Sequence, residues 1–210
     1  MSTLEVYFRD SHCARLTQKA NGDLQFQYLE AWLEHGRVPV SLTLPLKKAV
    51  YNHDETAPFV ANLLPEGDDL RNRLERLLHT DKNDDFGLLK AIGRECAGAL
   101  SFWPEGQSPR NKEPRYTRLN LDDFQLWREF AHQQPFVLKG QTIRMSLAGA
   151  QAKTALYFDA EDKPYLPENG APTSHILKPN IHGCLPGTVF TEYLSMKLAR
   201  AVLGEDEVPE

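Results

Sequence analysis

Short runs in which apolar and polar residues alternate open the chain. They cover residues 4–8, 14–17 and 24–28, and Asn21 and Gly22 stand between the last two runs. Alternation with a period of two is typical of half-buried strands, and Asn-Gly is a strong hairpin signal. The pattern therefore predicts a three-stranded antiparallel meander at the N-terminus.

Helical periodicity replaces alternation in the next part of the chain. Leucines recur on one face of residues 66–78, with arginines outside that face, and Pro65 separates this segment from a preceding helical pattern because proline fits only the first turn of a helix. The predicted elements are a helical turn at residues 32–33, a strand at 40–44, helices at 54–64, 66–78 and 86–92, and a strand at 98–103.

A change of composition follows at residues 104–114, which contain three prolines, one glycine and no large apolar residue. This composition is typical of a linker. An amphipathic helix is predicted after it at residues 121–131. We expect three parts: an N-terminal subdomain at residues 1–105, a linker with a connecting helix at 106–139, and a second unit at 140–210.

The second unit is organised around a run of small residues centred on Gly149. Apolar, β-favouring residues flank this run, and Lys153 follows it, which predicts a strand, a tight loop and a second strand. Small residues allow backbone N–H groups to approach an anion, and lysine supplies compensating charge. The loop alone favours a plain hairpin bend, because it matches no glycine-rich nucleotide motif.

The segments after the loop favour the phosphate interpretation. We expect an extra strand near Tyr165, a strand ending at Lys178, and a helix at residues 188–203 that carries Glu192 near its start. A loop over phosphates, a strand lysine and a helix glutamate that holds the lysine occur in this order in the small lobe of kinases. The predicted fold class is α+β: an antiparallel meander with helices, followed by a hairpin, strand and helix like those of a kinase small lobe.

Bulk properties limit the other functions. A net charge of -5 argues against a protein that coats nucleic acid by charge alone, and no run approaches the length of a membrane span. The three cysteines are far apart, which indicates a reducing compartment, and we expect a cytoplasmic protein. The group His175, His182 and Cys184 matches no zinc template, so no metal site is predicted.

Several segments in the same order resemble the HipA serine/threonine kinase toxins of bacterial toxin–antitoxin pairs. They are Leu-Thr-Leu-Pro-Leu at 42–46, Asn-Leu-Leu-Pro at 62–65, Ile-Gly-Arg-Glu-Cys-Ala-Gly-Ala-Leu at 92–100, Ser-Leu-Ala-Gly-Ala-Gln-Ala-Lys-Thr-Ala-Leu at 146–156, His-Ile-Leu-Lys-Pro at 175–179 and Glu-Tyr at 192–193. The resemblance spans nearly the whole chain.

This resemblance implies roles for individual residues. Lys178 is expected to contact the nucleotide, Glu192 to position Lys178, and Ser146 to be a regulatory phosphorylation site that displaces the loop. The residues implied to form the loop over the ATP phosphates are Ala148, Gly149, Ala150, Gln151, Ala152 and Lys153. Ala152 departs from the family pattern, because many relatives carry an acidic residue there. ATP and Mg2+ are the implied cofactors of the full-length family, with weak or absent binding expected for residues 1–210.

The resemblance also implies partners. Family members phosphorylate glutamyl-tRNA synthetase or related targets, and a HipB-type helix-turn-helix antitoxin, which binds the DNA, neutralises them. Their catalytic and magnesium-binding aspartates lie in a large lobe that we do not find in residues 1–210. We therefore expect the N-terminal portion of such a kinase, without catalytic residues, truncated and inactive alone. The alternative is a regulatory, antitoxin-like module that acts on a large-lobe kinase encoded by a separate chain.

Overall fold

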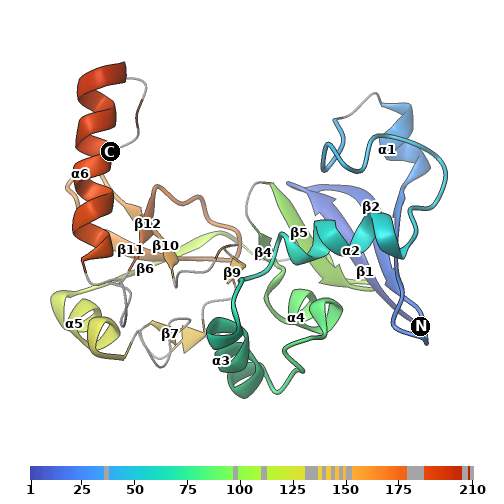
Figure 1. Cartoon of the computed structure of the whole chain (residues 1–210), viewed down its shortest axis with the longest axis horizontal. Coiled ribbons are helices and arrows are strands. Elements are labelled where there is room, and N and C mark those ends of the chain that lie inside the picture. Colours follow the sequence, from blue (N-terminus) through green and yellow to red (C-terminus); the bar gives the residue numbers. More distant parts are fainter. Residues whose placement is uncertain are drawn as a thin grey trace.

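The computed structural model describes residues 1–35, 38–96, 99–109, 113–130, 137–138, 141–142, 145–146, 149, 153–178, 187–204 and 208. Within these residues the protein is α+β, with two four-stranded antiparallel sheets, two short strand pairs and six helices. Figure 1 shows the first sheet and its helices on the right, and the second sheet with the last helix on the left.

The first sheet has the strand order β3-β2-β1-β5. Its strands are β1 (Ser2–Phe8), β2 (Ser11–Gln18), β3 (Leu24–Tyr28) and β5 (Leu100–Pro104). Each pairs with its neighbours in antiparallel register, for example Leu4 with Leu16 and Val6 with Phe102. The predicted meander and the strand after residue 98 are therefore confirmed.

Four helices belong to the N-terminal part. They are α1 (Glu30–Glu34), α2 (His53–Ala61), α3 (Asp68–Leu78) and α4 (Asp85–Ile92). Their buried side chains join those of the sheet in one hydrophobic cluster, in which Leu74, Leu88 and Leu89 are fully buried. Helix α2 begins with a capping box, in which Asn52 and Glu55 exchange side-chain and backbone hydrogen bonds. The predicted helices are confirmed to within a few residues.

The strand predicted at residues 40–44 is wrong. The segment turns instead, with the Leu44 amide donating to the Ser41 carbonyl and the Thr43 amide donating to the Ser41 hydroxyl. The hydroxyl of Tyr28 holds both ends of this turn, because it accepts from the Val40 amide and donates to the Leu44 carbonyl. Local serine hydrogen bonds offer the backbone an alternative to a strand.

The second sheet has the strand order β12-β10-β11-β6. Its strands are β6 (Arg115–Arg118), β10 (Thr154–Phe158), β11 (Pro164–Glu168) and β12 (His175–Leu177). Helix α5 (Leu121–Phe130) contributes Trp127 to a second, smaller cluster that also contains Leu156 and Leu166. Helix α6 (Thr188–Leu203) follows and ends at Gly204, as predicted.

Strand β6 was not predicted from the sequence. It lies within the segment expected to be a linker and pairs with β11, so that Thr117 stands opposite Leu166. The carboxylate of Glu168 accepts hydrogen bonds from Thr117 and Arg115 across this pair. Its polar, exposed residues give no alternation of apolar and polar positions, which explains why the pattern missed it.

Two short strand pairs complete the described structure. Strand β9 (Met145–Ser146) lies parallel to β4 (Glu95–Cys96), and β7 (Val137–Leu138) pairs with β8 (Gln141–Thr142). In the described residues, the strands on either side of the Gly149 loop do not pair with each other as in the expected hairpin. Strand β9 joins the N-terminal part, whereas β10 joins the second sheet. Among the described residues, no helix combines the length and apolarity needed to cross a membrane.

The second cluster supports β10, the strand that leads out of the Gly149 loop. Leu156 on β10 is 1% exposed, whereas Ile176 on the neighbouring β12 is 55% exposed. We expect Leu156→Ala to lower the free energy of unfolding by about 2–5 kcal/mol, because it leaves a cavity. Ile176→Ala, the matched control, changes it by less than about 0.5 kcal/mol. Urea denaturation of both variants measures this, and equal losses would contradict a packed second core.

Candidate functional site

The loop between β9 and β10 is attached to the N-terminal part of the molecule. The carbonyl oxygen of Gly149 accepts a hydrogen bond of 3.1 Å from the Glu66 amide, and Gly149 forms a parallel bridge with Pro65. Its φ of 114° lies in the region that favours glycine. The segment between α2 and α3 therefore anchors the loop, and we refer to Pro65 and Glu66 as the seat of the loop.

The ammonium group of Lys153 lies over the Cα of Gly149. A Cβ placed on Gly149 would stand 2.7 Å from Lys153 Nζ. The glycine thus permits two features at once, a backbone conformation that L side chains rarely adopt and the close approach of a cation. Positive charge is consequently concentrated at the loop backbone.

The strand pairing brings a second lysine to the same edge of the sheet. Thr154 at the start of β10 stands opposite Leu177 at the end of β12 in antiparallel register. Lys153 directly precedes β10 and Lys178 directly follows β12, so the two lysines lie at the same end of this strand pair. Both lysines are half-buried. Two cations at one end of a strand pair attract an anion.

Lys178 is paired with a carboxylate on the last helix. Its Nζ makes an ion pair with Oε1 of Glu192, in the first part of α6. The lysine and glutamate side chains are 30% and 46% exposed, so solvent screens the attraction and the pair contributes little to stability. It does hold the Lys178 ammonium in a defined place.

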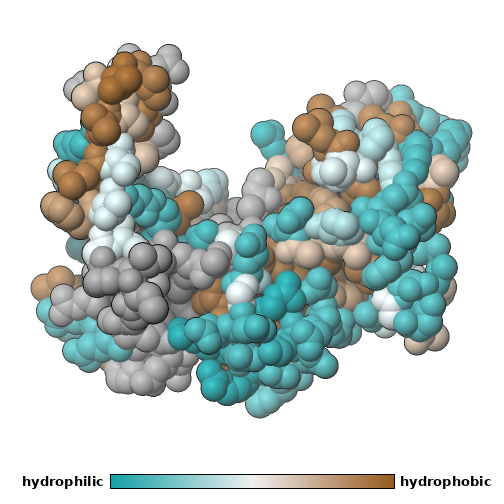
Figure 2. Space-filling view, in the orientation of Figure 1, coloured by the Kyte–Doolittle hydropathy of each residue, from teal (hydrophilic) through white to brown (hydrophobic). Residues whose placement is uncertain are grey.

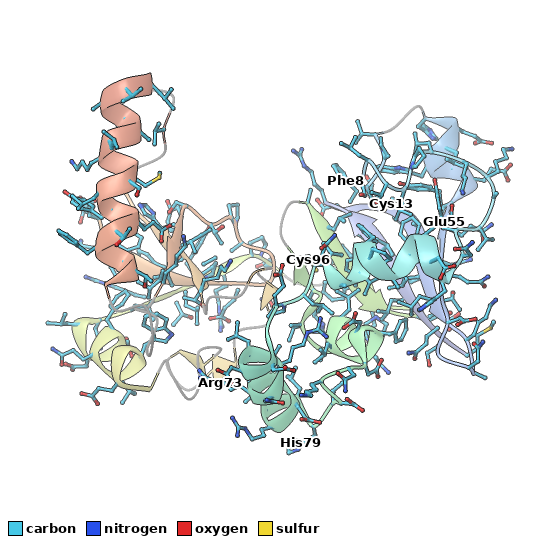
Figure 3. All side chains as sticks on the ribbon, viewed as in Figure 1. Phe8, Cys13, Glu55, Arg73, His79 and Cys96 are labelled. Carbon is cyan, nitrogen blue, oxygen red and sulfur yellow. The ribbon has the colours of Figure 1, made fainter. Side chains whose placement is uncertain are left out.

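Several predicted site residues lie outside the described part of the chain. They are Ala148, Ala150, Gln151 and Ala152. The backbone of Ser146 is described and stands opposite Cys96 in the β4–β9 pair. Cys96, labelled in Figure 3, is buried at this junction, and burial raises the pKa of its thiol to about 12, so the thiol remains protonated at neutral pH.

Sequence reasoning missed the residues that seat the loop. Pro65 and Glu66 were interpreted only as a helix break and a helix start, and no local pattern indicates a partner far along the chain. Thr154 was also missed. Its Oγ1 is fully buried and has no hydrogen-bond partner within the part of the chain that the structure describes.

The described residues fit a phosphate better than a metal ion. Gly149 allows the Lys153 ammonium to approach the loop backbone, and Lys178 adds a second cation at the same end of the β10–β12 pair. Among the described residues, no three His, Cys, Asp or Glu side chains come together as a metal site. We therefore assign no magnesium ligand to them. Chemically, this arrangement can bind and orient a polyphosphate.

The contact between Gly149 and Lys153 can be measured by a double-mutant cycle. We expect Gly149→Ala to destabilise the protein by about 1–3 kcal/mol, because alanine must adopt a strained φ and displace the lysine. The loss should be smaller in a Lys153→Ala background. Gly106→Ala is the matched control, since Gly106 has a φ of 79° but open space around it. Identical losses in both backgrounds would contradict the contact.

Comparisons with known proteins place the chain among relatives. Residues 4–103 match the model of the HipA N-terminal domain. The chain is 35% identical to a protein named "Putative kinase Y4mE" from Sinorhizobium fredii, over 98% of this chain and 49% of that protein. It is 29% identical to "Serine/threonine-protein kinase toxin HipA" from Shewanella oneidensis, over 96% of this chain and 45% of that protein.

A solved structure has the same fold. The complex of HipA, HipB and operator DNA from Shewanella oneidensis MR-1 contains a chain that matches with a TM-score of 0.70 and 26% identity, over 94% of this chain and 44% of that one. The chain thus spans about half the length of these relatives, at 44–49%. The family model, the relatives and the shared fold together show that the chain belongs to the HipA family.

Proposed function

We propose that the chain supplies the nucleotide-binding elements of a HipA-type serine/threonine protein kinase. The observation that carries this proposal is the Lys178–Glu192 ion pair, at the end of the β10–β12 strand pair from which Lys153 reaches Gly149. In protein kinases a strand lysine contacts the ATP phosphates and a helix glutamate holds that lysine. The order of parts and the ion pair match this scheme.

In the proposed site each group has one task. The loop at residues 148–153 covers the phosphates of ATP, and Lys153 and Lys178 neutralise their charge. Glu192 holds the Lys178 ammonium in place before the nucleotide binds. Magnesium supplies further charge neutralisation when it is bound with ATP. Its ligands and the group that orients the nucleophile belong, in this proposal, to the part of the relatives that the chain does not match.

Helix α6 exposes many apolar side chains around its surface, which supports this division. The exposed side chains are those of Val189, Phe190, Tyr193, Leu194, Leu198, Val202 and Leu203. Figure 2 shows brown patches along the visible side of α6. Contiguous exposed apolar surface marks an interaction site. We assign it to the remaining half of a HipA-type kinase, because the chain covers about half of its relatives, at 44–49%.

The exposed apolar side chains of α6 also support a second candidate function. A regulatory module that binds a separate kinase chain would also expose an apolar helix. Co-purification with a kinase chain encoded by a neighbouring gene would favour this alternative. Partners proposed from the family are a HipB-type antitoxin, through which the protein reaches DNA, and a substrate resembling glutamyl-tRNA synthetase.

Ser146 is the proposed regulatory phosphorylation site. A phosphate adds about -1.5 to -2 charges at neutral pH. On β9, this charge would compete with ATP for the cations of the loop. It would also stand on the strand that pairs with the buried Cys96. The first effect weakens ATP binding, and the second destabilises the β4–β9 pair.

Nucleotide binding is the first test. We expect the wild-type chain to bind ATP with magnesium, and Lys178→Met to weaken binding about 10- to 100-fold, from 1.5–3 kcal/mol for a hydrogen bond to a charged group. Lys197→Met, on the exposed surface of α6, is the control and should leave the Kd unchanged. Titration calorimetry measures all three. No binding by the wild-type chain, or equal effects of both substitutions, would refute the proposed site.

Phosphoryl transfer is the second test. Transfer depends on positioning and charge stabilisation by metal ligands and a nucleophile-orienting residue. We expect residues 1–210 alone to bind ATP without incorporating label from [γ-32P]ATP. A Lys178→Met chain should give the same background. Labelling of the wild-type chain above that background would contradict the assignment of the transfer residues to the other half of the relatives.

A further inference from the structure

Arg71 on α3 joins three segments near the seat of the loop. Its Nε donates to the Pro65 carbonyl at 3.2 Å, and its Nη1 donates to the Lys82 carbonyl at 3.0 Å and to Asp85 Oδ1 at 2.5 Å. The side chain is only 19% exposed. A half-buried guanidinium with this many acceptors fixes the relative positions of the segments that it contacts.

One of these segments is the seat of the Gly149 loop. The Pro65 carbonyl accepts from Arg71, and the amide of the next residue, Glu66, donates to the Gly149 carbonyl. Gly67, with a φ of 86°, then turns the chain into α3. A single peptide unit, between Pro65 and Glu66, therefore links the arginine to the loop backbone.

The other two contacts anchor the arginine to the N-terminal core. Asp85 and Lys82 lie at and before the start of α4, whose Leu88 and Leu89 are fully buried. The ion pair with Asp85 orients the guanidinium so that its Nε faces Pro65. The seat of the loop is thus braced against the first hydrophobic cluster.

We propose that Arg71 is a positioning residue for the phosphate loop and thereby sets the affinity of the protein for nucleotide. The inference rests on the function proposed above. Arg71 acts through the Pro65–Glu66 peptide and not through its charge. Its guanidinium already donates hydrogen bonds to Asp85 and to two carbonyl groups.

The chemistry of the side chain provides a discriminating substitution. Lysine keeps the positive charge and can still pair with Asp85, but a single ammonium cannot reproduce a planar fork that reaches Pro65 and Lys82 together. Arg71→Lys therefore separates positioning from charge. The matched controls are Arg76→Lys and Arg76→Ala, because Arg76 lies on the same helix and is exposed.

Two measurements on the full 210-residue chain test the inference. The first is the Kd for ATP with magnesium, which we expect Arg71→Lys and Arg71→Ala to raise about tenfold through loss of the loop seat. The second is hydrogen exchange of the Glu66 amide, measured by NMR without nucleotide. We expect exchange at Glu66 to become about tenfold faster in both variants. The amides of Leu88 and Phe102, in the N-terminal core, should keep their protection.

The exchange measurement separates a failure of this inference from a failure of the proposed function. If the wild-type chain binds no nucleotide, the proposed function fails, and faster exchange confined to Glu66 still supports Arg71 as the brace of the loop. Unchanged exchange at Glu66 in Arg71→Lys overturns the inference. Equal acceleration at Leu88 and Phe102 also overturns it, because the arginine would then act only on global stability. The same holds if the Arg76 variants raise the Kd equally.

Discussion

The hydrogen bond from the Glu66 amide to the Gly149 carbonyl is the contact on which the candidate site depends. It joins segments that are far apart in the sequence, and the parallel pair of β4 and β9 lies next to it along the chain. Ordering a loop costs conformational entropy, most of all at glycine. The bond and the neighbouring strand pair offset this cost, so the N-terminal part contributes directly to the geometry of the loop.

The charges of the site are arranged around the same loop. The Lys153 ammonium lies over Gly149, and Lys178 follows the strand that pairs with β10 at its Lys153 end. Glu192 balances one of these charges from α6. In the proposed function, a polyphosphate would meet a Lys178 ammonium that Glu192 already orients, which lowers the cost of organising the site during binding.

The sequence predicted the elements well and their long-range pairing poorly. The helix at residues 188–203 and the meander follow from strong periodicity, and the Lys178–Glu192 pair follows a known order of parts. The two-residue strand β9 carries no periodic signal, so its pairing with β4 in place of β10 could not be predicted. At residues 40–44 the alternation was present, but the Ser41 hydroxyl accepts from the Thr43 amide and the Tyr28 hydroxyl donates to the Leu44 carbonyl, which favours a turn. Local side-chain hydrogen bonds and contacts from distant segments therefore decided these cases.

In the proposed function, the position of the loop seat would couple the N-terminal part to nucleotide binding. The Pro65–Glu66 peptide contacts Arg71 on one side and Gly149 on the other. Suppose that another ligand and nucleotide both bind more tightly when the Glu66 amide is bonded to the Gly149 carbonyl. By thermodynamic linkage, each would then raise the affinity of the protein for the other by the same factor. The proposed phosphorylation of Ser146 would act on the β4–β9 pair, which precedes Gly149 along the chain. In the proposed function, the N-terminal domain is thus part of the nucleotide site, because the backbone that orients the phosphate loop is held in place by its helices.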